Sequence, residues 1–132
     1  MIGSNDMRLE QFVSSDDART WRRIGPLTLG RQMPGHLLRL RDGRILLTYG
    51  NRSWGNYGVD ARVSHDDGKT WGPSFRVATV PFPDSGYPSS VQLSQGDVVT
   101  AFYTQTAEGF HYEMRVARWS PDAAGEMKGL VP

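Results

Sequence analysis

The sequence predicts an all-β protein built from β-propeller blades, each of which is a four-stranded antiparallel meander. The first observation is a motif: Ser64 to Trp71 reads Ser-His-Asp-Asp-Gly-Lys-Thr-Trp, and Ser14 to Trp21 repeats its pattern with Ala18 in place of the glycine. The second is that each unit of about fifty residues reads as short strands separated by Gly- and Asp-containing turns. Because a blade takes roughly 40 to 50 residues and a ring has about four to eight blades, the 132 residues predict an incomplete propeller of about two blades.

The repeated motif reads as a turn with an aromatic anchor. Asp66 is placed to accept hydrogen bonds from the backbone N–H groups that follow it, and Gly68 provides a position with φ > 0. Trp71 is expected to bury its ring just past the turn. We therefore interpret these turns as structural, and their adjacent aspartates are not interpreted as a catalytic pair.

The strands can be placed in order along the chain, which is read as one domain over residues 1–132. If the strands of a blade are named A to D, the chain runs C-D, then A-B-C-D, then A-B-C. The Asp42-Gly43 pair predicts a hairpin between A and B, and Val59 to Ser64 alternates apolar and polar residues as a strand does. The strands are expected at residues 9–14, 22–29, 37–40, 45–50, 59–64, 75–77, 90–93, 98–104 and 112–119, within blade parts of about 8–30, 35–80 and 87–120.

The segments between and beyond these strands are expected to be irregular. Residues 1–7 read as a flexible lead-in, Gly30 to Gly35 as a polar link, and residues 121–132 as a loosely ordered tail. Arg115 matches Arg62 of the preceding unit, and both are expected to be structural.

Composition excludes several classes of function. With 15 basic and 14 acidic residues the net charge is +1, which gives no electrostatic case for nucleic acid or for an anionic membrane. There are no cysteines, and His36, His65 and His111 are far apart in the pattern, so no metal site and no cofactor are expected. No stretch has the apolar length of a membrane span or of a signal peptide, and the compartment stays open.

The order of the strands places two groups of loops at opposite ends of each sheet. Because strand A runs one way and strand B returns, the start of A and the end of B share one end, which we call the near rim; the C-D turns lie at the far rim. The near rim collects His36, Arg52, Trp54, Tyr57 and Tyr87. Aromatic faces that stack on sugars, beside an arginine that can hold a carboxylate, predict a carbohydrate site there.

The motif and its setting resemble the Asp-box, or bacterial neuraminidase repeat, of sialidases and other proteins with six-bladed propellers. Thr48 to Arg52 looks like the context of one of the three arginines that hold the substrate carboxylate, and Gly86 to Val91 is similar to the segment of the nucleophilic tyrosine. The resemblance covers Gly35 to Trp119. It implies hydrolysis of a terminal acidic sugar, with Tyr87 as the nucleophile and Arg52 binding the carboxylate. A neutral tyrosine suits a carbon that already bears a carboxylate, because it is repelled less than an anion would be.

The chain also departs from the sialidase pattern. Gln105 stands at the position that repeats Arg52, and Glu113 falls inside an expected strand, so the sequence identifies no glutamate partner for Tyr87. Without such a base, Tyr87 would be a poor nucleophile. Packing of Tyr87 in a Tyr-Pro turn, and solvation of Arg52 or its pairing with Asp60, remain open alternatives.

The sequence therefore leaves two functions open. One is sialidase-like processing of a glycan that ends in an acidic sugar; the other is a non-catalytic carbohydrate-binding or assembly module, in which Trp54 and Tyr57 either stack on sugar or cover a blade edge. Incomplete blades leave unpaired strand edges, so we expect a homo-oligomer or the remainder of a longer chain to complete the ring.

Overall fold

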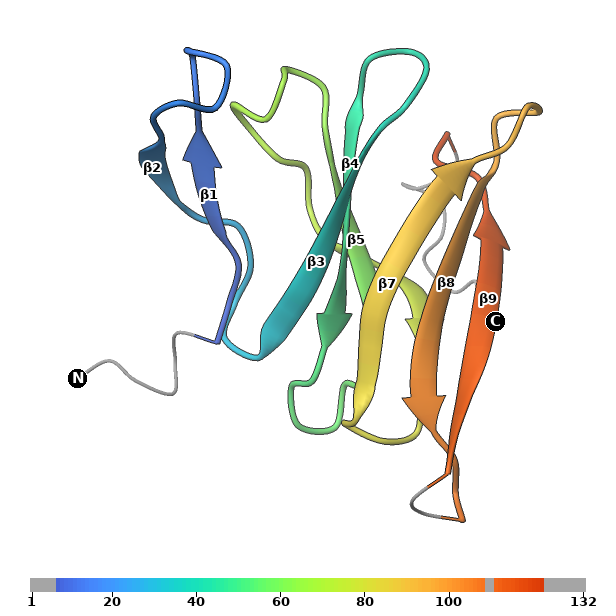
Figure 1. The fold of residues 1–132 in the computed structure, drawn as a ribbon. Helices are drawn as coiled ribbons and strands as arrows, with labels where there is room; N and C mark the ends of the chain where they lie inside the picture. The colour runs from blue at the N-terminus through green and yellow to red at the C-terminus, as the bar shows by residue number, and fades with distance from the viewer. Residues whose placement is uncertain (1–6, 109–110, 123–132) are drawn as a thin grey trace.

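The structure is a computed structural model that describes residues 7–108 and 111–122, and it confirms an all-β fold with no helix among these residues. The strands form three antiparallel sheets, β1-β2, β3-β4-β5-β6 and β7-β8-β9, which stand side by side in chain order (Figure 1). This grouping is the one expected from the sequence, whereas the identity of the sheets as propeller blades stays a prediction. The strands are β1 (Glu10–Val13), β2 (Arg22–Pro26), β3 (Gln32–Arg39), β4 (Ile45–Asn51), β5 (Gly58–Ser64), β6 (Phe75–Thr79), β7 (Ser85–Gln92), β8 (Val98–Gln105) and β9 (Tyr112–Trp119). Most of the expected lead-in at 1–7 and of the expected tail at 121–132 lies outside the described residues, namely residues 1–6 and 123–132.

Two strands begin earlier than the sequence predicts. β3 starts at Gln32, inside the expected link, and β7 starts at Ser85. Each strand shifts register near its start, between Gln32 and Gly35 in β3 and between Gly86 and Ser89 in β7. A bulge accommodates a proline that regular pairing would exclude, so the prolines in both segments do not end the strands.

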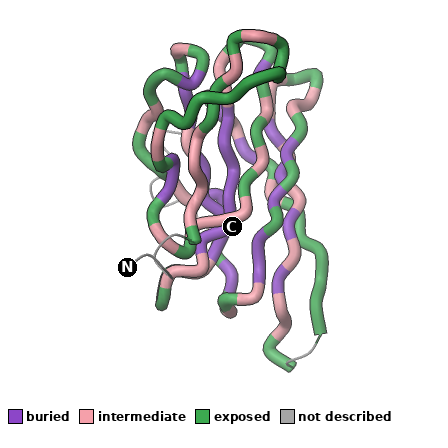
Figure 2. The backbone as a smooth tube through the Cα atoms, turned by 60° about the vertical axis from the view of Figure 1, so that its left-hand side comes forward, coloured by how far each residue is buried: buried purple, intermediate pink, exposed green. Residues whose placement is uncertain are grey.

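Face-to-face packing of the sheets buries two apolar clusters. Figure 2 shows the buried stretches of the strands in purple. β4 is buried along most of its length because sheets cover both of its faces. Between the second and third sheets lie Leu40, Leu46, Val59, Ala61, Val63, Val77, Ala78, Val80, Val98, Phe102 and Trp119. Between the first and second sheets lie Leu27, Leu47 and Tyr49. Trp71 packs against this smaller cluster and is only partly buried, less than expected, while Trp21 of the first motif is 60% exposed.

Both motifs adopt the same turn at the far rim. Asp66 accepts hydrogen bonds from the Thr70 backbone N–H at 2.8 Å and from its hydroxyl at 2.5 Å, and these bonds lower the pKa of Asp66 to about 2. Asp16 is bound in the same way by Thr20, with its pKa also lowered to about 2. Ala18 takes the glycine position of the turn at φ 65°, in the left-handed region that costs a non-glycine residue about 1 to 2 kcal/mol.

The pairing of β9 corrects the alignment of the repeats. The sequence aligns Arg115 with Arg62. In the structure Arg62 pairs with Leu47 of β4, whereas Arg115 pairs with Phe102 of β8. Phe102 is the counterpart of Tyr49, two residues beyond Leu47. The strand has therefore slipped by two residues relative to β5. A slip of two keeps each side chain on its face of the sheet, so the apolar pattern cannot reveal it.

Arg62 has the structural role that the sequence predicts. Its guanidinium donates to the carbonyl oxygens of Leu27 at 2.7 Å, Gly72 at 2.8 Å and Trp71 at 3.2 Å. It thereby joins the segment that follows β2 to the turn that follows β5. One side chain thus holds the first sheet against the second.

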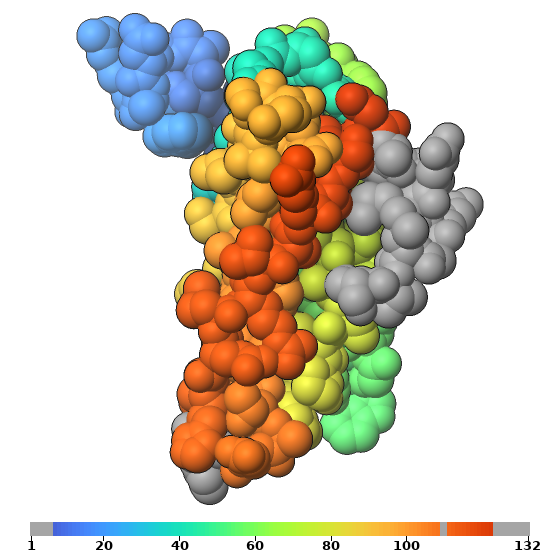
Figure 3. All heavy atoms as spheres, turned by 90° about the vertical axis from the view of Figure 1, so that its right-hand side faces the viewer, coloured from blue at the N-terminus to red at the C-terminus, as the bar shows by residue number. Residues whose placement is uncertain are grey.

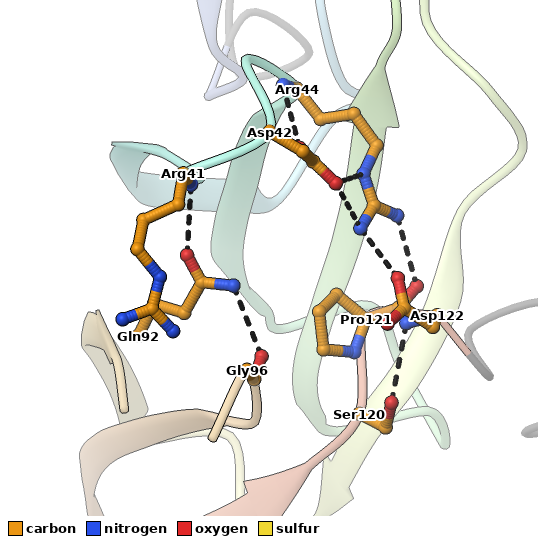
Figure 4. Close-up of polar contacts among 8 residues, drawn as sticks. All are labelled: Arg41, Asp42, Arg44, Gln92, Gly96, Ser120, Pro121 and Asp122. Carbon is orange, nitrogen blue, oxygen red and sulfur yellow. Dashed lines mark hydrogen bonds and ion pairs between the residues drawn. The ribbon is translucent and has the colours of Figure 1, made fainter. Parts of the chain in front are cut away.

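Polar contacts at the far rim join the second and third sheets (Figure 4). Arg44, in the β3-β4 turn, pairs with Asp42 at 2.7 Å and with Asp122, just after β9, at 2.6 Å. In the same turn, the Arg41 backbone N–H donates to Gln92 Oε1 at 2.9 Å. These contacts hold the second and third sheets together at the far rim.

Candidate functional site

The near rim brings together segments that are distant in sequence. It is the lower end of the sheets in Figure 1, where β3 and β7 begin and β4 and β8 end. The β4-β5 loop and the β6-β7 link both lie at this end, and the two motifs lie at the other. The topology thus brings Arg52 and Tyr87 together, 35 residues apart in the chain, as the strand order predicts.

Arg52 is fixed at the junction of the second and third sheets. Its Nε donates to the Ser85 carbonyl oxygen and its Nη2 to the Tyr103 hydroxyl, each at 3.1 Å. The guanidinium carbon lies 5.8 Å from the centroid of the Tyr87 ring, within the range of a cation–π contact. The alternative pairing of Arg52 with Asp60 is wrong, because the Asp60 carboxylate pairs with Arg76 at 2.5 Å.

Tyr87 lies on the bulge of β7 and faces solvent. Its side chain is 62% exposed, and its backbone has φ 47°, in the left-handed region that is strained for a tyrosine. The preceding Gly86 has φ 118° and packs against Gly50 of β4. Strained backbone of this kind is concentrated at functional sites, so its occurrence beside Arg52 marks this position as a candidate.

A carboxylate with two tyrosines completes the cluster, and sequence analysis missed all three residues. Asp84 accepts a hydrogen bond from the Tyr103 hydroxyl at 2.5 Å and from the Tyr112 hydroxyl at 2.7 Å, and these bonds lower the pKa of Asp84. Burial, together with the bond to Asp84, raises the pKa of Tyr103 to about 12. The sequence holds one signal for this group. The units repeat at an offset of 53 residues, and Tyr103 stands at the position that Gly50 has in the preceding unit.

A cavity of about 250 Å³ opens beside this cluster. Its lining includes a second arginine that the sequence analysis did not single out, Arg31, whose Nε donates to the Arg52 carbonyl oxygen at 3.0 Å. The lining residues are Met7, Arg31, Met33, Arg52, Pro83 and Asp84. The lining thus holds two positively charged guanidinium groups and one carboxylate, which already accepts hydrogen bonds from two hydroxyls. The excess positive charge favours the binding of an anionic group in this cavity.

Trp54 and Tyr57 lie in the β4-β5 loop at the near rim. The expected near-rim position of His36 is wrong, because β3 begins at Gln32 and places His36 in mid-strand, opposite Thr48. Trp54 is 92% exposed in the β4-β5 loop and meets Tyr57 edge-to-face, with ring centroids 6.4 Å apart. His36 lies on β3, where its Nδ1 accepts a hydrogen bond from the Ser90 backbone N–H of β7 at 3.2 Å. Of the predicted site residues, only Arg52 lines the cavity; Tyr87, His36, Trp54 and Tyr57 do not.

Other kinds of site find no support in the part of the chain that the structure describes. Among residues 7–108 and 111–122, no group of three or more His, Cys, Asp or Glu side chains is placed to hold a metal ion. The same residues contain no helix that is long and apolar enough to cross a membrane.

Comparison with known proteins identifies structural relatives but no family. No protein-family model matches the chain, and no curated protein matches it. The chain is similar to a solved structure from Dyadobacter fermentans DSM 18053, described as a protein of unknown function, with 29% sequence identity and a TM-score of 0.65. The match covers 89% of this chain and 31% of that one, so this chain spans about a third of the length of its relative.

Proposed function

We propose that the near rim recognises a terminal acidic sugar, as the resemblance to sialidases implies. One observation carries the proposal: Arg52 and Arg31 line one cavity, and the guanidinium of Arg52 also lies 5.8 Å from the exposed ring of Tyr87, which is outside the lining. The guanidinium groups offer forked donors to a carboxylate, and the aromatic ring offers an apolar face to the sugar. Small-molecule sites combine apolar lining with a few such polar groups.

Hydrolysis is the second candidate, and the position of Tyr87 beside Arg52 favours it. A tyrosine nucleophile needs a carboxylate base within hydrogen-bond reach. Within the described residues, no hydrogen bond joins the Tyr87 hydroxyl to a carboxylate, and Asp84 is bound by Tyr103 and Tyr112 instead. The described geometry therefore supports binding better than it supports turnover by this chain alone.

The experiment compares the binding of sialic acid to the parent chain and to two arginine variants by calorimetry. A charge-assisted hydrogen bond is worth roughly 1.5 to 3 kcal/mol, so Arg52→Ala is expected to weaken binding about tenfold to a hundredfold. Arg22→Ala, on exposed β2, removes the same charge away from the cavity and should bind as the parent does. Equal affinities in all three proteins would reject the site.

Turnover is tested separately with a fluorogenic sialoside. Cleavage that Tyr87→Phe abolishes would support the enzyme, because the substitution removes only the nucleophilic oxygen. Binding that survives Tyr87→Phe, without turnover in the parent, would support the binding module.

We also propose that a further sheet of the same kind packs on the third sheet, supplied by a second copy or by a longer chain. Met114 and Val116 of β9 are exposed apolar residues on a strand that pairs only with β8 among the described residues. Light scattering over a dilution series distinguishes the two sources. A discrete oligomer indicates a second copy, whereas a monomer throughout excludes it.

A further inference from the structure

The cavity of the proposed acidic-sugar site is lined by charges of both signs. Among its described lining residues, Arg31 and Arg52 are positive and Asp84 is negative. They come from three segments: the link before β3, the β4-β5 loop and the link before β7. In Figure 3 the β4-β5 loop (green) lies beside the β6-β7 link (yellow) at the lower end, and a hydrogen bond from Arg52 to the Ser85 carbonyl oxygen joins them. The negative group is therefore part of the site itself.

These three charges are not neutralised by one another. No ion pair between residues that the structure describes involves Arg31, Arg52 or Asp84. The Tyr103 hydroxyl lies between two of them, since it accepts a hydrogen bond from Arg52 Nη2 at 3.1 Å and donates one to Asp84 Oδ1 at 2.5 Å. Because this linking group is neutral, the carboxylate keeps its full charge and the guanidinium keeps further donors for a ligand.

Hydrogen bonds hold Asp84 in its ionised form. Its two oxygens accept from the hydroxyls of Tyr103 and, at 2.7 Å, of Tyr112. Bonds to the charged form favour it, so they lower the pKa of Asp84. The cavity therefore has a fixed negative charge among its lining residues at neutral pH.

A fixed negative charge in this position affects ligands according to their own charge. It repels a doubly charged anion twice as strongly as a singly charged one at the same place. The cost of taking an anion out of water rises more steeply still, as the square of its charge. Two guanidinium groups alone would balance a dianion, but with Asp84 in the same lining they balance a single negative charge. The described lining is thus matched to a monoanion.

We propose that Asp84 is a specificity-determining residue, which makes the cavity select a sugar with one negative charge against a sugar phosphate with two. Discrimination of this kind comes from a repulsive group as well as from attractive ones. The inference rests on the proposed function of the arginine site and adds the class of anion that the site rejects.

The test compares sialic acid with glucose 6-phosphate by calorimetry at about pH 8, where a phosphate monoester, with its second pKa near 6, is a dianion. The parent is expected to bind sialic acid at least tenfold more tightly. Asp84→Asn keeps the size of the side chain and removes its charge, so it should reduce this preference at least tenfold. Asp97→Asn is the matched control, because it removes the same charge at the far rim, where Asp97 pairs with Arg118 at 2.8 Å. It should keep the preference of the parent.

A second measurement uses the parent alone. At about pH 5 the phosphate is mostly a monoanion, whereas the carboxylate of sialic acid stays ionised. The described lining residues include no histidine, so the change of pH acts chiefly on the phosphate. The preference for sialic acid should therefore shrink at least threefold.

Three results would overturn the role of Asp84 and leave the arginine site intact. They are a parent that binds the phosphate as tightly as sialic acid at about pH 8, a preference that Asp84→Asn does not reduce, and a preference that is equal at the two pH values. Failure of the parent to bind either ligand would overturn the arginine site and the role of Asp84 with it.

Discussion

Replacing Gly50 by alanine tests how closely β4 packs against β3 and against the third sheet. A Cβ at Gly50 would lie 3.0 Å from the Met33 carbonyl oxygen and 3.3 Å from Gly86 Cα. Ordinary carbon contacts lie at about 3.5 to 4.0 Å, and both neighbours here are backbone atoms, so the strands must move apart.

The size of the effect follows from two opposing contributions. Overpacking costs about 1 to 3 kcal/mol, and alanine gains about 0.5 to 1 kcal/mol over glycine inside a strand. From the middle of these two ranges we expect Gly50→Ala to lower the free energy of unfolding by about 1 kcal/mol, measured from urea unfolding followed by tryptophan fluorescence. Gly35→Ala, on β3, is the control, because its added Cβ chiefly meets the movable ends of Leu9 and Leu47, and its loss should be smaller.

A Gly50→Ala variant at least as stable as the parent would refute this reasoning. It would show that the sheets can separate at the near rim without cost.

Three further predictions concern the turns and the core. Ala18→Gly should raise the free energy of unfolding by up to about 1 kcal/mol, because it relieves the left-handed strain at φ 65°; an unchanged urea midpoint would contradict this. The lowered pKa of Asp66, about 2, means that its bonds stabilise the fold above pH 4 and lose that effect as the pH falls toward 2. Thr70→Val removes the hydroxyl that bonds Asp66, so the free energy of unfolding should fall less between pH 4 and pH 2 in this variant than in the parent. The same fall in both proteins would contradict this. Trp119→Ala should cost about 3 to 5 kcal/mol, since this buried ring meets Phe75 and donates to Thr100 at 3.0 Å; a loss below about 1 kcal/mol would show that the cluster is loosely packed.

The strand order and the two rims could be predicted from the sequence, because they follow from turn residues and apolar alternation. Asp42-Gly43 turns one hairpin, and the topology then dictates that Arg52 and Tyr87 share a rim. The early start of β7 could not be predicted in this way, since Pro88 argues against a strand unless a bulge accommodates it. The slip of β9 was hidden because a shift of two residues preserves the pattern of faces.

The rest of the candidate site depends on long-range contacts that local patterns do not encode. Tyr103 lies in the middle of an expected strand, where an aromatic residue is ordinary. Its hydrogen bonds with Asp84, from the link before β7, and with Arg52 make it part of the site. Arg31 was read as part of a polar link, and its approach to Arg52 depends on how that link meets the β4-β5 loop.

The central claim is that the near rim recognises the negative charge of an acidic sugar through Arg52 and Arg31. The most direct measurement is the affinity of the parent chain for sialic acid and for its methyl ester, which has the same shape without the charge. The account predicts that the ester binds at least tenfold more weakly, since it loses at least one charge-assisted contact. Equal affinities for the acid and the ester, or tighter binding of the ester, would contradict it.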